Sequence, residues 1–207
     1  MAGTIGDYAT LVVNTDSDIQ SMADLLAEYS DDPNSFAIGG GSVPGGMDHL
    51  VAAMVMEAAG EDPTAFKYIP YDTGGPAMAA LLSGEIKALS TGFSEAVAMA
   101  EAGEVRILGI TAPERVETFG DAPTMTEQSI EVEFVNWRGF FGAPGMPAET
   151  LAAHQDAIAK MYDTPEWEEV RARNGWVNIH NPGDEFKAFL EDQEKTIGDL
   201  MKKLGFL

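Results

Sequence analysis

The chain has 207 residues, of which 45% are hydrophobic, enough to bury a core and to form one large or two small domains. Its 34 acidic and 12 basic residues give a net charge of -22, which repels nucleic acid and anionic membranes, so we expect no nucleic-acid partner. There is no cysteine, which excludes disulfides, thiol catalysis and zinc–thiolate sites.

Strand-like and helix-like runs alternate through the first half of the chain. A β-rich run at 10–14 leads into a helix over 18–30, whose apolar residues recur at helical spacing. The elements expected next are a strand at 36–39, a helix at 49–60, a strand at 66–71, a helix at 76–84, a strand at 86–91, a helix at 94–103 and a strand at 105–111. Such alternation is typical of parallel strands joined by crossover helices. The sequence therefore predicts an α/β fold, with an open sheet and helices on both faces.

The character of the sequence changes after Pro123. The stretch EVEFVNWRGFFGAPGMP at 131–147 is an extended aromatic run broken by glycines and prolines, and the chain beyond it is mainly helical in pattern. We expect a domain boundary or crossover strand here, which divides the chain into 10–133 and 134–207.

Two glycine-rich turns each follow an expected strand and open a helix, GGGSVPGG at 39–46 and TGGP at 73–76. Glycine lets a ligand approach the main chain, and the amides at a helix start favour an anion. Ligands of open α/β sheets bind outside the carboxyl ends of the strands, so loops on neighbouring strands would converge. The candidate ligand-binding residues are Gly40, Gly41, Ser42, Thr73, Gly74 and Gly75, with Thr91 and Ser94 from a third loop. The alternatives are ordinary strand-to-helix turns and, for Ser94, a helix cap.

Other site chemistries find little support in the sequence. The loops lack a P-loop lysine and the acidic residue of a dinucleotide site, and no serine stands in a GxSxG elbow. His49, His154 and His180 are scattered, so we predict no catalytic residue and no metal site, and we expect His49 to be structural or capping. Arg138, beside Trp137, either lines a cleft and binds a carboxylate or forms a structural ion pair with one of the many acids.

Several stretches resemble the periplasmic solute-binding proteins of tripartite tricarboxylate transporters, the TctC or Bug family. The matching stretches are GGGSVPGGMDHL, YIPYDTGGPAMAALLSGEI, SEAVAMAEAGEVRILGITAPER, APTMTEQ, EFVNWRGFFGAPGMP and LMKKLGF. They agree with the family in order and spacing from about residue 11 to the end. The GGGS and VNWRG forms are most similar to members that take citrate and related tricarboxylates.

The resemblance implies a two-domain clamshell of the periplasmic-binding-protein fold, which is not an enzyme and needs no cofactor. It would close around a small di- or tricarboxylate such as citrate, in the periplasm or another extracytoplasmic space, and deliver it to membrane permease subunits. Family members begin with a further N-terminal segment that supplies the opposing jaw, and we expect this chain to begin after it and without a signal peptide. We therefore expect 10–133 to form a complete lobe and 134–207 a truncated one, whose exposed edges favour self-association.

Two rival hypotheses stay open at this point. The first is an α/β enzyme that uses the glycine-rich loops for a phosphorylated substrate. The second is a sensing fragment that partners a signalling receptor in place of a permease.

Overall fold

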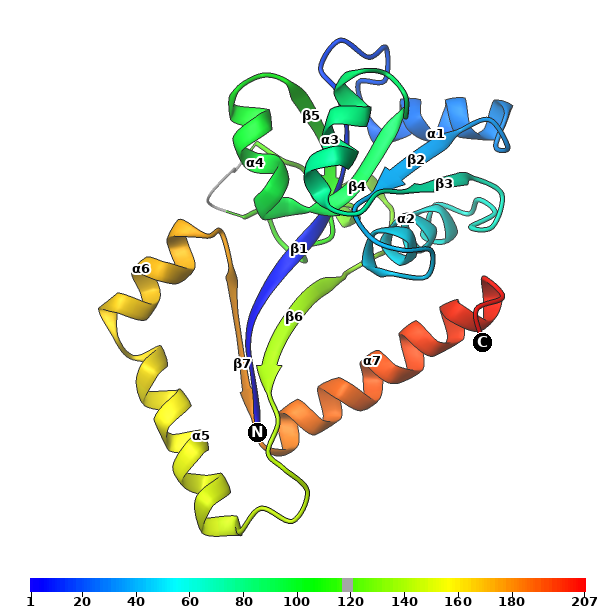
Figure 1. The fold of residues 1–207 in the computed structure, drawn as a ribbon. Coiled ribbons are helices and arrows are strands. Elements are labelled where there is room, and N and C mark those ends of the chain that lie inside the picture. The colour runs from blue at the N-terminus through cyan, green and yellow to red at the C-terminus, as the bar shows by residue number, and fades with distance from the viewer. Residues whose placement is uncertain (117–120) are drawn as a thin grey trace. The chain divides into compact units, whose positions relative to one another are not determined.

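The computed structural model describes residues 1–116 and 121–207 (Figure 1). The chain divides into two compact units: unit 1 consists of Met1–Asp7 and Asn136–Asp199, and unit 2 of Tyr8–Val135 and Leu200–Leu207. In chain order the elements are β1 (Ala2–Asn14), α1 (Met22–Asp31), β2 (Ala37–Gly40), α2 (Met47–Ala58), β3 (Lys67–Pro70), α3 (Gly74–Leu82), β4 (Ala88–Gly92), α4 (Phe93–Glu101), β5 (Val105–Ile110), η2 (Thr126–Gln128), β6 (Val135–Phe140), α5 (Ala148–Tyr162), α6 (Pro165–Arg173), β7 (Val177–Pro182) and α7 (Asp184–Lys203).

Unit 2 is built on a sheet flanked by helices, with strand order β3-β2-β4-β1-β5. Strand β2 runs parallel to β3 and β4, as expected from the alternating pattern. The expectation of parallel pairing throughout is wrong, because β1 runs antiparallel to both β4 and β5. Alternation of strands and helices predicts connections, but it does not report in which direction the first strand enters the sheet.

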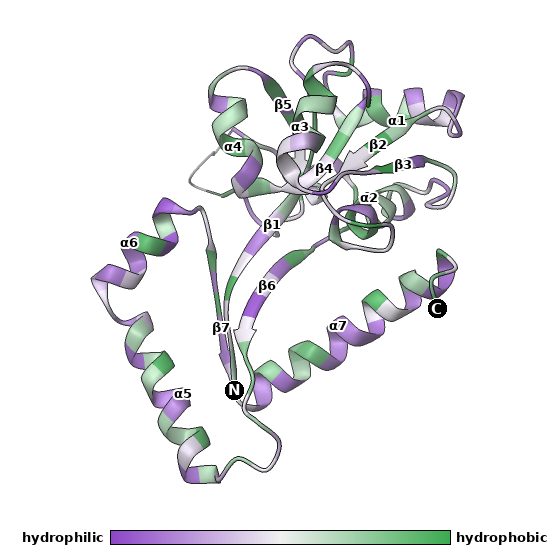
Figure 2. Cartoon of the chain, in the orientation of Figure 1, coloured by the Kyte–Doolittle hydropathy of each residue, from purple (hydrophilic) through white to green (hydrophobic). Residues whose placement is uncertain are grey.

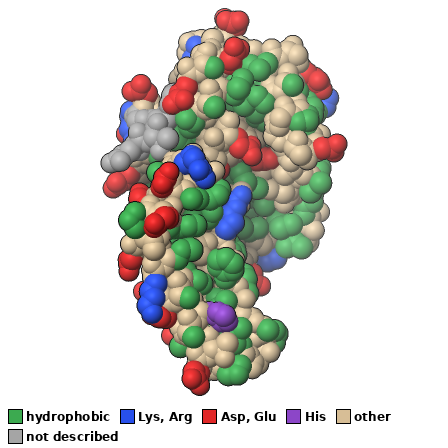
Figure 3. Space-filling view, turned by 60° about the vertical axis from the view of Figure 1, so that its left-hand side comes forward, with side chains coloured by type: hydrophobic (Ala, Val, Ile, Leu, Met, Phe, Trp, Pro, Cys, Tyr) green, Lys and Arg blue, Asp and Glu red, His purple; other side chains and the backbone are tan. Residues whose placement is uncertain are grey.

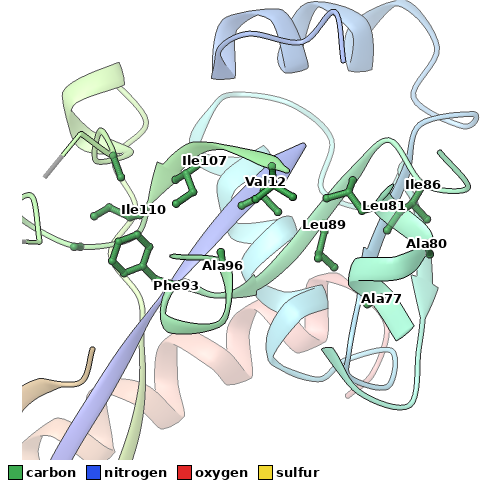
Figure 4. Packing of buried hydrophobic residues seen from close by; sticks show 13 residues of the cluster. Val12, Ala77, Ala80, Leu81, Ile86, Leu89, Phe93, Ala96, Ile107 and Ile110 are labelled. Atoms are coloured by element: carbon green, nitrogen blue, oxygen red, sulfur yellow. The ribbon is translucent and has the colours of Figure 1, made fainter. Parts of the chain in front are cut away.

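One cluster of the core of unit 2 lies between this sheet and the helices α3 and α4 (Figure 4), and the buried apolar residues of α1 and α2 belong to the core as well. Strand residues Val12 and Leu89 are fully buried there, and Phe93 of α4 is 2% exposed. On α1, Ser21 caps the N-terminus by accepting the Asp24 amide, and the apolar side of the helix is buried. Coloured by hydropathy, α1 carries green residues on one side and purple ones on the other (Figure 2).

Unit 1 contains three strands, in which the N-terminal part of β1 pairs with β6 and, antiparallel, with β7. Strand β7 was not expected, since we had predicted a mainly helical segment after residue 147. Strand β1 is also longer than the predicted 10–14, because it extends back to Ala2. Gly3 permits the close pairing with β7: its amide donates to Asn181 Oδ1 at 3.1 Å, and an added Cβ atom would collide with that oxygen.

Acidic side chains are distributed over the face shown in Figure 3, and fewer basic ones stand among them. Among the described residues, no helix has both the length and the apolar character that crossing a membrane would require.

Candidate functional site

The two glycine-rich loops of unit 2 meet at the ends of β2 and β3. Gly40 pairs with Pro70 across these parallel strands, and the Tyr71 amide donates to the Gly40 oxygen at 2.8 Å. A Cβ atom added at Gly41 would lie 2.5 Å from the Gly74 nitrogen. Only glycine at position 41 therefore allows the two backbones this close approach. The structure brings the loops together as the position of their strands had led us to expect.

A third loop joins them at the end of β4. The Thr91 hydroxyl donates to Glu95 Oε2 at 2.7 Å, and that same oxygen would lie 2.7 Å from a Cβ atom added at Gly74. An open pocket of about 520 Å³ lies between the second and third of these loops. It is lined by Thr73, Gly74, Gly75, Met78, Thr91, Glu95 and Met99. Of the predicted site residues, Thr73, Gly74, Gly75 and Thr91 thus share one pocket.

The N-cap residues of the helices that follow these loops supply no side-chain cap, although Ser42 Oγ accepts the Asp48 amide in the first turn of α2. The N-cap residues are Gly46 for α2, Thr73 for α3 and Gly92 for α4, and none of them donates or accepts a capping hydrogen bond through its side chain. Helix α1 of the same unit does have a side-chain cap, from Ser21. Free amides in the first turn of a helix bind water or an anion, and a ligand carboxylate can be that anion. Ser94 follows the N-cap of α4, Gly92, by two positions, so the alternative in which Ser94 is the N-cap is wrong.

Ser42 is engaged inside its own loop. Its Oγ accepts the Asp48 amide at 3.1 Å and lies 3.2 Å from the Tyr68 hydroxyl, which itself donates to the Ser42 backbone oxygen at 2.8 Å. We expect Ser42 to act as a hydroxyl donor to a ligand, and in the structure its hydroxyl also helps to fix the start of α2. The hydroxyl groups of Ser42 and Tyr68 therefore fix the conformation of the first glycine-rich loop.

Asp48 is the acidic residue at the base of the same loop. It lies in the first turn of α2 and is only 7% exposed. Burial raises the pKa of its carboxyl group to about 6, and the charge of Glu95 acts in the same direction. The Ser42 hydroxyl and the Gly41 amide oppose that rise by favouring the charged carboxylate. A buried acid with a raised pKa therefore packs against the first glycine-rich loop.

His49 has the structural role that the sequence predicted. Its Nδ1 accepts the Gly45 amide at 3.0 Å, and its ring stacks on Tyr68 at a centroid distance of 4.4 Å. The rings of Phe66 and Phe206 meet it edge-on. Burial lowers the pKa of His49, so it is a neutral acceptor at neutral pH. Across residues 1–116 and 121–207, no group of three or more potential metal ligands is found.

Arg138 lies on β6 in unit 1, so the loop site of unit 2 is described without it. The side chain is exposed, and its Nη1 donates to the Asn136 backbone oxygen at 2.6 Å. Within the described part of the chain it forms no ion pair, so the interpretation as a structural salt bridge is not supported.

Comparison with known proteins decides the family. The family model described as the tripartite tricarboxylate transporter family receptor, TctC, matches residues 3–206. The chain belongs to the TctC family. A UPF0065 protein of Bordetella pertussis is 24% identical to this TctC-family chain over 197 residues, which are 94% of this chain and 59% of that protein.

Solved structures share the fold. A TctC solute-binding protein from Polaromonas, solved without ligand, has 26% identity and a TM-score of 0.82, with 98% of this chain and 68% of that chain covered. A Rhodopseudomonas palustris protein solved with adipate has 19% identity and the same TM-score of 0.82, and 99% of this chain and 67% of that chain are covered. The fold is therefore that of the periplasmic binding proteins. The chain spans 59% of the length of the Bordetella relative.

Sequence reasoning missed three residues of the site, Asp48, Tyr68 and Glu95. A weak signal existed for two of them. Thr91 and Glu95 are four residues apart at the start of a helix, a spacing at which side chains meet, and Asp48 stands two residues after a glycine-rich loop, in the first turn of a helix. Tyr68 carried no such signal, because its role depends on the pairing of β2 with β3.

Proposed function

We propose that this chain is an extracytoplasmic solute-binding protein, or a large part of one, which captures a small di- or tricarboxylate for a tripartite tricarboxylate transporter. One observation carries the proposal: the glycine-rich loops of unit 2 pack backbone to backbone, and uncapped helix starts surround the pocket beside them. Membership of the TctC family supports it, and so does a fold neighbour solved with adipate.

The proposed chemistry is recognition of a carboxylate by neutral donors. Backbone amides at 40–42 and 73–75 supply the hydrogen bonds, and the absence of side chains on their glycines leaves room for the anion. The hydroxyl of Thr73 adds a donor at the pocket wall, since it makes no capping bond. A net charge of -22 does not forbid an anion here, because local amides and helix starts dominate the field at short range.

The remaining site residues enter the proposal with less specific roles. Thr91 lines the pocket and donates a hydrogen bond to Glu95, which lines it too. Ser94 lies next to Glu95 in the sequence, in the first turn of α4. Arg138 is proposed as a further ligand for a carboxylate, which its exposed guanidinium suits by geometry and charge. We propose citrate as one of the acids that the protein binds. We also propose that the protein binds its ligand without catalysing a reaction.

The proposal extends to partners and organisation. The ligand would pass to membrane permease subunits in the periplasm or an equivalent space. The lobe at 10–133 would carry the glycine-rich loops. The segment at 134–207 would favour self-association. Size-exclusion chromatography with light scattering measures the resulting molecular mass.

A thermal-shift screen tests the function. The chain is melted with citrate, adipate, malate, succinate, glutamate, phosphate and ATP, in low and high salt. A ligand at a hundred times its dissociation constant stabilises the folded state by about 2.7 kcal/mol. For a protein of this size that raises Tm by about 5 to 10 °C. We expect this shift from a di- or tricarboxylate and not from ATP. A shift with ATP or phosphate alone would contradict the proposal and favour the enzyme hypothesis.

A further inference from the structure

Asp48 packs against the first glycine-rich loop, and its carboxyl group interacts with the Ser42 hydroxyl and the Gly41 amide of that loop. A Cβ atom added at Gly40 would lie 2.5 Å from the Asp48 Cβ atom, so this side chain packs directly under the loop. Its own amide is held by Ser42 Oγ at 3.1 Å. When charged, the Asp48 carboxylate is favoured by the Ser42 hydroxyl and the Gly41 amide, which are two of the proposed ligand-binding groups.

Further charged and titratable groups face Asp48 from the elements packed around it. Glu95 on α4 adds negative charge, and Tyr68 on β3 is neutral at ordinary pH because burial raises its pKa. His49 follows Asp48 on α2 and is held neutral by burial. No cation is found among these neighbours. A ligand carboxylate in this loop would therefore meet the charges of Asp48 and Glu95 with no cationic side chain here to balance them.

We propose that Asp48 controls anion binding by the glycine-rich loop: a ligand carboxylate binds when Asp48 carries a proton and is excluded when Asp48 is ionised. In the ionised state, Asp48 competes for the Gly41 amide and the Ser42 hydroxyl and repels a second anion. In the protonated state, its O–H becomes a donor and the competition ends. Asp48 is thus a specificity-determining residue, which couples capture of an acid to uptake of one proton. This inference rests on the proposed function.

The pH dependence of the ligand affinity follows from the coupling between ligand binding and protonation of Asp48. If binding requires the protonated form, the apparent affinity scales with the protonated fraction of the free protein. With the pKa of Asp48 at about 6, that fraction falls about 50-fold between pH 6 and pH 8. Adipate is a suitable probe, because its carboxyl groups, like those of Asp and Glu, are mostly ionised throughout this range.

The experiment is isothermal titration calorimetry of the full chain with adipate at pH 6, 7 and 8, in two buffers with different ionisation enthalpies. We expect affinity to fall about 50-fold from pH 6 to pH 8, with uptake of nearly one proton per adipate at pH 8. In Asp48→Asn the affinity should be the same at all three values and, at pH 8, higher than in the natural protein. Asp24→Asn, which removes a first-turn acid from α1, is the matched control and should keep the pH dependence.

His49 is the competing explanation, because its protonation at low pH would also favour an anion. His49→Asn keeps an acceptor for the Gly45 amide but cannot titrate. The proposal requires the pH dependence to survive in His49→Asn and to vanish in Asp48→Asn, and the reverse result would overturn it. Affinity that is independent of pH in the natural protein would overturn it as well, while leaving carboxylate binding intact.

A second measurement uses the natural protein alone and covers the case in which Asp48→Asn does not fold. The carbon-13 NMR signal of the Asp48 carboxyl group is titrated with and without saturating adipate. We expect a free pKa near 6 that rises when adipate binds. An unchanged or lower pKa with adipate bound would refute the coupling. If the natural protein binds no acid at any pH, in contrast, the proposed function itself fails and the inference falls with it.

Discussion

Asp48→Asn should change the pH dependence of folding stability even when no ligand is present. Burial raises the pKa of the Asp48 carboxyl group from its ordinary value of 3.8 to about 6 in the folded protein. A group with a raised folded pKa adds most stability below its unfolded pKa and loses that stability as the pH rises through its folded pKa. A difference of about two units corresponds to about 3 kcal/mol in full, of which about 2 kcal/mol falls between pH 4.5 and pH 8. Asparagine cannot ionise, so the variant is free of this loss.

The assay is urea unfolding of the natural chain and of Asp48→Asn at pH 4.5 and pH 8. The difference in unfolding free energy between the two proteins should shift by about 2 kcal/mol in favour of the variant as the pH rises. Effects that do not depend on pH, such as an altered helix start, cancel in this comparison. A shift below about 0.5 kcal/mol, or one of opposite sign, would refute the burial-driven pKa of Asp48.

Asp24→Asn serves as the control of opposite sign. Hydrogen bonds from Ser21 and the Gln20 amide lower the pKa of Asp24. Its contribution is therefore present above its unfolded pKa and is lost as the pH falls through its folded pKa. The control variant should therefore be less stable than the natural chain by nearly the same amount at pH 8 and at pH 4.5, because the Asp24 contribution is lost only below its ordinary pKa of 3.8.

Three further predictions concern the loops and the tail. Gly41→Ala should weaken adipate binding and lower Tm by several degrees, because the added methyl group would lie 2.5 Å from the Gly74 nitrogen. The control Gly198→Ala should leave binding unchanged, because the space around Gly198 is open. Ser42→Ala should cost about 1 kcal/mol of unfolding free energy in urea, since the Asp48 amide loses its acceptor, while Ser35→Ala at an exposed turn should cost less. Phe206→Ala should raise the pKa of His49 towards its ordinary value in an NMR titration, because it uncovers the ring, and an unchanged pKa would contradict this packing.

The strands and helices of unit 2 could be predicted because each carries a local signal. Apolar residues at helical spacing marked α1 and α2, and glycine or proline marked most of the ends. The antiparallel entry of β1 could not be predicted, since strand direction is decided by long-range pairing. Strand β7 was missed because VNIHNP is polar and ends in proline, so it lacks the apolar run of a central strand.

The site could be predicted where backbone chemistry alone defines it. Glycines next to helix starts pointed to the loops around Gly41 and Gly74, and the structure brings those two residues into contact. The acidic part of the site escaped prediction, because in a chain with 34 acidic residues no single carboxyl group stands out. Burial distinguishes Asp48 from the rest, and burial follows only from the fold.

The most direct test of the glycine-loop site is a two-dimensional nitrogen–proton NMR titration of the full chain with adipate at pH 6. The amide signals of Gly41, Ser42, Gly74 and Gly75 should shift together and saturate with one dissociation constant, since these amides are the proposed donors. Signals of the distant α1 residues should stay in place. Saturable shifts elsewhere with these four amides unmoved, or no shift with adipate, citrate or malate, would contradict a carboxylate site in these loops.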